Sequence, residues 1–315
     1  MKADLNVVIG KLRLKNPVMV ASGTFGYAEE FKDFFDLKQL GAVVTKTVTL
    51  APRPGNPAPR TCETPAGLLN SIGLENPGID VFLNEKLPFV RKLGVPLIAS
   101  IASERDPAEF VELARRLEKV AAVAALELNI SCPNVKHAGA ATALISQDAA
   151  ATKAVVRSVR RVSTKTIITK LSPNVTDIVP IALAAQEAGS DAVALINTVT
   201  GMCVDVRRRS SRIAMPVGGL SGPAVRPIAV RMVWEAYRKI TIPIIGMGGI
   251  VDTFSALEFI IAGATAVSVG TANFTDPAVT ARIIGGLKTY LEEHKIDSVR
   301  SLTGSITRPC VKPTK

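Results

Sequence analysis

Aromatic residues are scarce in this 315-residue chain, at 4% of all positions with a single Trp. Proteins that bind single-stranded nucleic acid use aromatic side chains as stacking platforms between basic residues. The net charge of +11 raises the question of an anionic partner, but the basic residues are dispersed. Only residues 207–212 concentrate them, with four arginines and no aromatic residue. The sequence therefore does not predict nucleic-acid binding.

Cysteine and histidine are equally rare, with four and two residues respectively. The cysteines Cys62, Cys132, Cys203 and Cys310 lie far apart, and neither a CxxC nor an HExxH motif occurs. A chain of this length does not need disulfides to be stable, so we expect free thiols in a reducing compartment. No metal site is predicted.

Long apolar runs are missing as well. The longest uncharged run covers residues 259–275, contains two glycines and falls short of the ~20 apolar residues that a membrane span needs. Charges interrupt the apolar residues of the first segment every few positions, so it lacks the core of a secretory signal. We expect a cytoplasmic protein that makes no membrane contact.

Short apolar runs rich in β-branched residues alternate with amphipathic segments along the whole chain. The predicted strands lie within 17–23, 42–48, 96–102, 126–131, 166–172, 192–198, 242–249 and 266–271. The predicted helices cover 28–37, 80–92, 106–119, 148–162, 175–188, 223–239, 253–262 and 277–293. Eight strand-helix repeats without a linker predict one α/β domain over residues 1–315, a (β/α)8 TIM barrel. An open doubly wound sheet is the alternative.

The first segment, before the first predicted barrel strand, alternates apolar and polar residues around Gly10. This pattern predicts a β-hairpin that closes the N-terminal end of the barrel. Active sites of this fold lie at the other end, where the strands finish and the loops begin. The polar and glycine residues at these strand ends are Ser22, Lys46, Ser100, Asn129, Cys132, Asn134, Lys170, Asn197, Thr198, Gly248, Gly249, Gly270 and Thr271.

Three kinds of residue in this set point to chemistry. Lys46 and Lys170 end apolar strands, where an ammonium group is costly unless it meets an anion or acceptors; ordinary exposed lysines are the alternative. The glycines after the seventh and eighth strands allow backbone amides to approach a phosphate, or simply make tight turns. Cys132, among hydrogen-bonding residues, is a candidate for a reactive thiol. Neither GxGxxG nor GxxxxGK[ST] occurs, so no Rossmann or nucleoside-triphosphate site is predicted.

Several longer strings carry a family resemblance. They are ASGTFG from Ala21, KTVT from Lys46, ETPAGLLNSIGLENPG from Glu63, ELNISCPNVK from Glu127, KLSPNV from Lys170, GGLSGPA from Gly218, IPIIGMGGI from Ile242 and VGTANF from Val269. The chain resembles the class 1 dihydroorotate dehydrogenases almost from end to end, and the class 1B, NAD-linked type in particular. These are oxidoreductases of pyrimidine biosynthesis that oxidise (S)-dihydroorotate to orotate with FMN. The resemblance also implies a partner subunit with FAD and a 2Fe-2S cluster, around a homodimeric core, as a heterotetramer.

Residue roles follow from the same resemblance. Cys132 matches the catalytic base, and Lys46 is the second catalytic residue. The implied substrate-binding residues are Lys46, Asn70, Ser71, Ile72, Gly73, Leu74, Asn129, Asn134, Asn197 and Thr198. The implied FMN-binding residues are Ser22, Lys46, Thr47, Ser100, Asn129, Lys170, Ile196, Gly222, Gly248, Gly249, Gly270 and Thr271.

Three other functions remain open at this point. A class 1A enzyme would use fumarate as electron acceptor, and a dihydropyrimidine dehydrogenase-like flavin barrel would take a substrate without a carboxylate. A non-catalytic phosphate-binding barrel is the third, suggested by the net charge and the arginines of residues 207–212.

Overall fold

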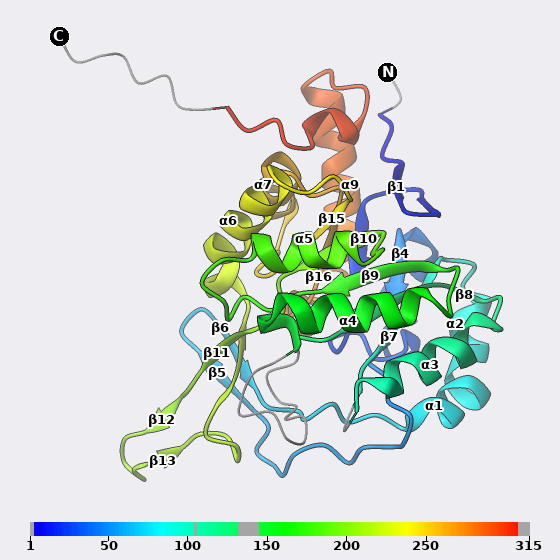
Figure 1. Cartoon of the computed structure of the whole chain (residues 1–315). Coiled ribbons are helices and arrows are strands. Elements are labelled where there is room, and N and C mark those ends of the chain that lie inside the picture. Colours follow the sequence, from blue (N-terminus) through cyan, green and yellow to red (C-terminus); the bar gives the residue numbers. More distant parts are fainter. Residues whose placement is uncertain (1–2, 104–105, 132–144, 308–315) are drawn as a thin grey trace.

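Eight parallel strands close into a barrel in the computed structural model, which describes residues 3–103, 106–131 and 145–307 (Figure 1). Each strand is followed in the barrel by the next one along the chain, and the last pairs with the first. The barrel strands are β3 (Val18–Val20), β4 (Ala42–Val44), β7 (Leu97–Ile101), β8 (Val123–Asn129), β9 (Thr166–Lys170), β10 (Ala192–Leu195), β15 (Ile244–Met247) and β16 (Ala266–Val269). The predicted (β/α)8 barrel is confirmed, and the closed sheet excludes the doubly wound alternative.

The composition of these strands explains their position. Every residue of β7, β9 and β16 is buried, because one face points into the barrel and the other is covered by helices. Strands with two covered faces lose the alternation of polar and apolar residues. The near-continuous apolar runs of the sequence therefore form the strands of the barrel.

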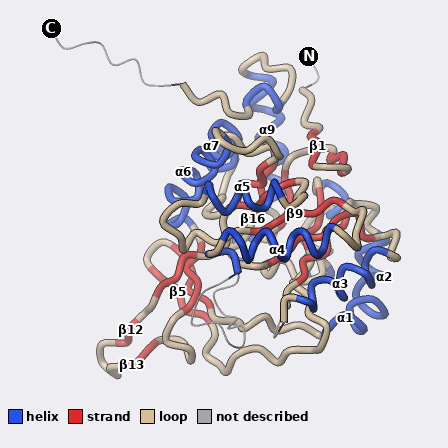
Figure 2. Tube along the Cα trace, viewed as in Figure 1, coloured by secondary structure: helices blue, strands red, loops and turns tan. Residues whose placement is uncertain are grey.

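Helices surround the barrel (Figure 2). The longer ones bury one apolar face; α3, for example, buries Phe110, Leu113 and Leu117. The α-helices are α1 (Gly78–Val81), α2 (Leu87–Lys92), α3 (Ala108–Glu118), α4 (Ala149–Arg160), α5 (Val179–Glu187), α6 (Arg226–Tyr237), α7 (Thr253–Ala262), α8 (Ala272–Thr275) and α9 (Val279–Glu293). A π-helix, η3 (Phe82–Lys86), joins α1 to α2, and short 3-10 helices are η4 (Ile145–Gln147), η5 (Pro223–Val225) and η6 (Val299–Leu302).

The first predicted helix, residues 28–37, is wrong. The structure has two short 3-10 helices there, η1 (Glu29–Phe31) and η2 (Leu37–Gln39). Ala28 has φ 71°, a left-handed conformation, so a helix cannot begin at this residue. Aromatic packing, with Phe31 stacked on Phe25 at a centroid distance of 3.9 Å, then directs the segment instead of helical periodicity.

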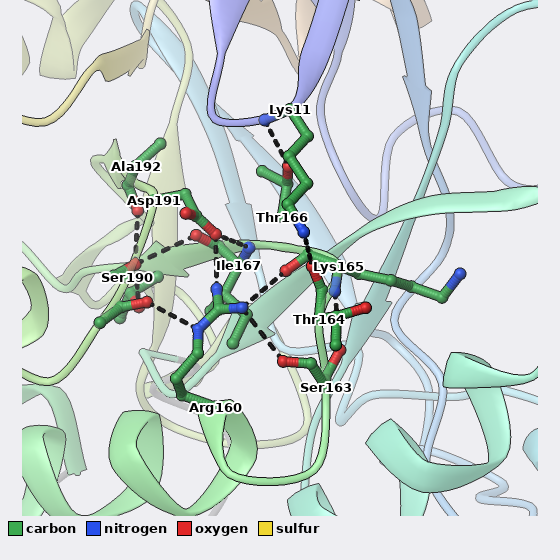
Figure 3. Close-up of polar contacts among 12 residues, drawn as sticks. Lys11, Arg160, Ser163, Thr164, Lys165, Thr166, Ile167, Ser190, Asp191 and Ala192 are labelled. Atoms are coloured by element: carbon green, nitrogen blue, oxygen red, sulfur yellow. Dashed lines mark hydrogen bonds and ion pairs between the residues drawn. The ribbon is translucent and has the colours of Figure 1, made fainter.

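The predicted N-terminal hairpin is present as β1 (Val7–Ile9) and β2 (Leu12–Leu14). It lies against the N-terminal ends of β9 and β10, where the Lys11 backbone amide donates to Thr166 Oγ1 at 2.9 Å (Figure 3). Gly10 makes the turn with φ +55°, and a Cβ there would lie 2.9 Å from the side chains of Thr166 and Asp191. The hairpin therefore closes this end of the barrel.

A second sheet, not predicted from the sequence, stands beyond the opposite end of the barrel. Its strands, in spatial order, are β11 (Val199–Gly201), β14 (Gly218–Ser221), β6 (Gly67–Asn70) and β5 (Thr61–Thr64). A hairpin of β12 (Val204–Asp205) and β13 (Ser210–Ser211) carries the arginine cluster and projects from the body of the molecule (Figure 1). None of the helices described here is long and apolar enough to cross a membrane.

Candidate active site

A cavity of about 310 Å³ opens where the barrel strands end and the second sheet begins. Small-molecule sites typically have volumes of ~300–1,000 Å³. Residues from the ends of several barrel strands form its base, and the four-stranded sheet covers one side. The barrel thus places its cavity at the end where this fold holds active sites.

Most residues selected from the sequence line this cavity. They are Ser22, Lys46, Thr47, Asn70, Ile72, Gly73, Leu74, Asn129, Lys170, Ile196, Asn197, Thr198, Gly222, Gly248, Gly249, Gly270 and Thr271. Ser71 and Ser100 are fully buried and stand behind the lining residues. Cys132 and Asn134 lie outside the described residues.

Two amide and two hydroxyl side chains form a hydrogen-bonded cluster at one wall, which Asn129, Asn197 and Thr47 line. Asn129, the last residue of β8, donates from Nδ2 to Thr47 Oγ1 at 3.1 Å. Asn197 follows β10 and donates from Nδ2 to Ser131 Oγ at 3.0 Å, with Asn129 Oδ1 at 3.4 Å. These contacts orient both amide groups, so each can offer a defined donor or acceptor to a flat ligand.

The two lysines also lie on this cavity. Lys170 ends β9, and its Nζ is 4.0 Å from Oε1 of the buried carboxylate of Glu127. The Lys46 backbone amide donates to the Gly26 carbonyl at 2.8 Å, which anchors the segment after β4. Both ammonium groups are placed where they could meet negative charge on a ligand, although Glu127 lies beside Lys170 and Glu75 also lines the cavity.

Glycines form the rim after β15 and β16. Gly249 has φ +77°, and a Cβ there would lie 2.8 Å from the Gly222 carbonyl oxygen, so only glycine fits without a shift. Gly270 would place a Cβ at an ordinary distance of 3.7 Å from Ala21, so its space is open. Thr271 Oγ1 donates to Ser221 Oγ at 2.8 Å and joins this rim to β14.

The segment after β6 lies over the cavity. Asn56 holds it, donating from Nδ2 to the Ser71 carbonyl at 2.9 Å. Gly73 and Leu74 both have positive φ, 77° and 56°. Asn70 donates to the Gly219 carbonyl at 3.1 Å, which ties this segment to β14.

Sequence reasoning missed several lining residues, among them Thr24, Thr61, Leu68, Glu75, Leu220, Ser221, Met247 and Phe274. Leu220 and Ser221 belong to GGLSGPA, and Met247 belongs to GMGGI, so their neighbourhood in the motifs was available as a signal. Thr61 and Leu68 reach the cavity only because β5 and β6 join the second sheet. No signal in the sequence predicted that pairing.

Cys62 and Cys203, the free cysteines among the described residues, do not line the cavity. Burial raises the pKa of the Cys62 thiol, and the neighbouring Cys203 adds to this effect. A raised pKa keeps the thiol protonated and unreactive. Residues 3–103, 106–131 and 145–307 contain no group of His, Cys, Asp and Glu side chains that could hold a metal ion.

Residues 4–291 match the family model described as dihydroorotate dehydrogenase. The chain belongs to the dihydroorotate dehydrogenase family. A relative from Trichlorobacter lovleyi is 51% identical over 306 residues, covering 97% of this chain and 99% of the relative. Relatives from Geotalea uraniireducens and Geobacter sulfurreducens are each 50% identical over 305 residues, with the same coverage. All three are named dihydroorotate dehydrogenase B (NAD(+)), catalytic subunit. The resemblance stated from the motifs is confirmed.

Proposed function

We propose that this chain is the catalytic subunit of an NAD-linked dihydroorotate dehydrogenase, which oxidises (S)-dihydroorotate to orotate in pyrimidine biosynthesis. The observation that carries the proposal is the cavity, where two lysines, three asparagines and a glycine rim converge at the open end of the barrel. Membership of the family and relatives of this name at about half identity over nearly the whole chain support it.

The cavity fits FMN. Ser268 on β16 lines it, and its buried Oγ has no hydrogen-bond partner among the described residues, as expected if a ligand supplies one. Gly222, Gly248, Gly249, Gly270 and Thr271 would hold the phosphate by backbone amides, because the glycines have no side chain to keep a ligand away. Ser22, Lys46, Thr47, Asn129, Lys170 and Ile196 would hold the ring, with Ser100 behind them. FMN, when bound, supplies the hydride acceptor.

The asparagines suit the substrate. Dihydroorotate presents ring amides and a carboxylate, and each amide edge needs a donor and an acceptor in fixed orientation. Asn129 and Asn197, oriented by Thr47 and Ser131, would pair with the ring. Asn70, Thr198, Asn134 and the segment 71–74 would complete this pocket, and Lys46 would meet negative charge.

Cys132 is the proposed base. Its thiolate would remove the proton from C5 of dihydroorotate while hydride leaves C6. An ordinary thiol has a pKa near ~8.5, so only a small share is ionised at neutral pH. Flavin reduction by dihydroorotate is therefore expected to accelerate from pH 6 to 9.

The electrons would leave through a partner subunit that carries FAD and a 2Fe-2S cluster and reduces NAD. The relatives are named as catalytic subunits of an NAD(+) enzyme, which implies a second subunit. The sequence of this chain has no GxGxxG motif with which to bind the nicotinamide dinucleotide itself. A heterotetramer around a homodimeric core is the proposed assembly.

The test is anaerobic reconstitution with FMN. We expect a yellow protein whose absorbance near the flavin maximum bleaches on addition of dihydroorotate and shifts on addition of orotate. A protein that takes up no FMN, or that bleaches with dihydrouracil and not with dihydroorotate, contradicts the proposal. Efficient fumarate reduction by the chain alone would replace the NAD-linked type with the fumarate-linked one.

A further inference from the structure

Two charged side chains stand out on the described barrel strands. Glu127 on β8 and Lys170 on β9 are the only Asp, Glu, Lys or Arg residues within the bounds of the eight strands. Their side chains are 2% and 6% exposed. Because a buried ion pair stabilises a fold no better than apolar residues of similar size, stability alone does not account for this pair.

Glu127 lies one layer beneath the cavity. Alternate residues of a strand share one side, so Glu127 and Asn129 project to the same side of β8. Asn129 lines the cavity, whereas Glu127 does not. The carboxylate therefore reaches the cavity through its neighbours, which are Lys170 at 4.0 Å and Ser100, whose Oγ donates to Oε1 at 2.9 Å.

Ser100 begins a chain of hydroxyl groups that leads to the cavity. Its Oγ is 3.0 Å from Thr47 Oγ1, which is 2.8 Å from Ser22 Oγ. Thr47 and Ser22 both line the cavity. The chain thus connects a buried carboxylate to two groups that face the ligand space.

The carboxylate determines the direction of every hydrogen bond in this chain. An ionised carboxylate only accepts, and a hydroxyl has one hydrogen to donate. Ser100 gives its hydrogen to Glu127, so it must accept from Thr47. The Thr47 hydroxyl hydrogen is then already donated to Ser100, so Thr47 Oγ1 accepts from both Ser22 Oγ and Asn129 Nδ2. Ser22 is left with lone pairs only.

We propose that Glu127 is a positioning residue for the bound flavin. It orients the chain so that Ser22 presents an acceptor to the cavity and Asn129 turns its amide nitrogen to the wall, and its charge offsets that of Lys170. The inference rests on the proposed function in so far as the ligand is FMN. It adds a residue that touches neither cofactor nor substrate.

The experiment compares Glu127→Gln with Glu118→Gln, a carboxylate on α3 that accepts hydrogen bonds at the other end of the barrel. Each apoprotein is titrated with FMN, and the midpoint potential of the bound flavin is measured with a chemical reductant, without substrate. In Glu127→Gln the amide oxygen can still accept from Ser100, so the hydroxyl chain keeps its direction and FMN binding should weaken less than about threefold. We also expect at least a tenfold shift toward reduced flavin, about 30 mV for a two-electron couple, because Lys170 is no longer offset. Glu118→Gln should change neither.

Ser100→Ala separates orientation from charge. It cuts the hydroxyl chain and keeps the carboxylate, so FMN binding should weaken about threefold to tenfold with an unchanged potential. A folded Glu127→Gln protein with an unchanged potential overturns the inference. If that variant does not fold, Ser100→Ala with wild-type affinity overturns it. Wild-type protein that binds FMN but is not reduced by dihydroorotate refutes only the proposed function, whereas failure to bind FMN refutes both.

Discussion

The two ends of the barrel differ in whether their polar groups find hydrogen-bond partners within the protein. At the N-terminal end, Arg160 donates to the carbonyls of Ser163, Lys165 and Gly189 at 3.0–3.1 Å and to Asp191 Oδ2 at 2.5 Å (Figure 3). At the C-terminal end, Ser268 Oγ is buried with no partner among the described residues. The groups around Arg160 are bonded within the protein. At the cavity the hydroxyl chain is also bonded within the protein, but Ser268 Oγ is left for a ligand.

This difference separates stability from function within one fold. Where every polar group is hydrogen-bonded within the protein, each bond contributes to the stability of the fold, and no group is left to bind a ligand. Where a polar group lacks a protein partner, the fold is less stable, and a ligand that binds there restores the lost stabilisation. Substitutions at the two ends should therefore change different measured quantities.

The largest expected effect is on catalysis at the open end. Cys132→Ala removes the proposed base, and general base catalysis contributes ~100-fold to 10,000-fold. We expect flavin reduction by dihydroorotate to slow by that range, measured by stopped flow, while the melting temperature stays the same. Cys203→Ala, a half-buried thiol before β12, is the control. Wild-type rates in Cys132→Ala would remove the thiol from the mechanism.

The next effect is on stability at the closed end. Arg160→Ala leaves Asp191 without its ion pair and three carbonyls without a donor, which should cost about 2–3 kcal/mol of unfolding free energy. Arg157→Ala, an exposed arginine on the same helix, should cost less than about 0.5 kcal/mol. Urea denaturation measures both. An Arg160→Ala protein with changed FMN affinity and unchanged stability would contradict the separation of stability and binding between the two ends.

A pair of glycine substitutions sharpens the contrast. Gly249→Ala and Gly10→Ala both add a methyl group at positive φ and in close contact. We expect Gly249→Ala to weaken FMN binding about tenfold, because the rim must shift. Gly10→Ala should leave FMN binding unchanged and lower the unfolding free energy by about 1 kcal/mol or more. Equal effects of both variants on FMN binding would mean that the hairpin is coupled to the cavity.

The smallest effect depends on pH. Burial of Glu118 opposes its ionisation, but hydrogen bonds from Ser163 and Thr164 prevail and lower its pKa from 4.5 to about 2. Because the pKa is lower in the folded protein, the ionised carboxylate stabilises the fold at every pH above the ordinary pKa of 4.5. This contribution disappears as the pH falls toward 2. Glu118→Gln should therefore cost about 1–2 kcal/mol at pH 7, after allowance for partial exposure, and much less near pH 2. Thermal unfolding across pH would show a constant difference if Glu118 had no such role.

Much of the fold could be predicted, because parallel barrel strands have a local signature. The runs that became β7, β9 and β16 are mostly apolar, and helical patterns separate them. Residues 28–37 show where this reasoning fails, since packing between Phe25 and Phe31 overrode a plausible helical pattern. The second sheet was missed because its strands are short and because β6 and β14 pair across about 150 positions of sequence.

The candidate site follows the same division. Lysine and asparagine at the ends of apolar strands can be read directly, because a barrel brings all such ends to one rim. Glu127 could not be recognised in this way, because nothing in ELNIS tells which polar residue faces the cavity and which lies beneath it.

The amino-acid sequence by itself determined the eight barrel strands, the N-terminal hairpin and the polar residues at the strand ends. These features depend on hydrophobic periodicity and on the residue types at strand ends, which are local properties of the chain. Only the tertiary structure decided which of these residues share a cavity, which hydroxyl groups connect in a chain, and that a buried carboxylate pairs with Lys170. Those relations depend on distances between residues far apart along the chain, which arise when the barrel closes.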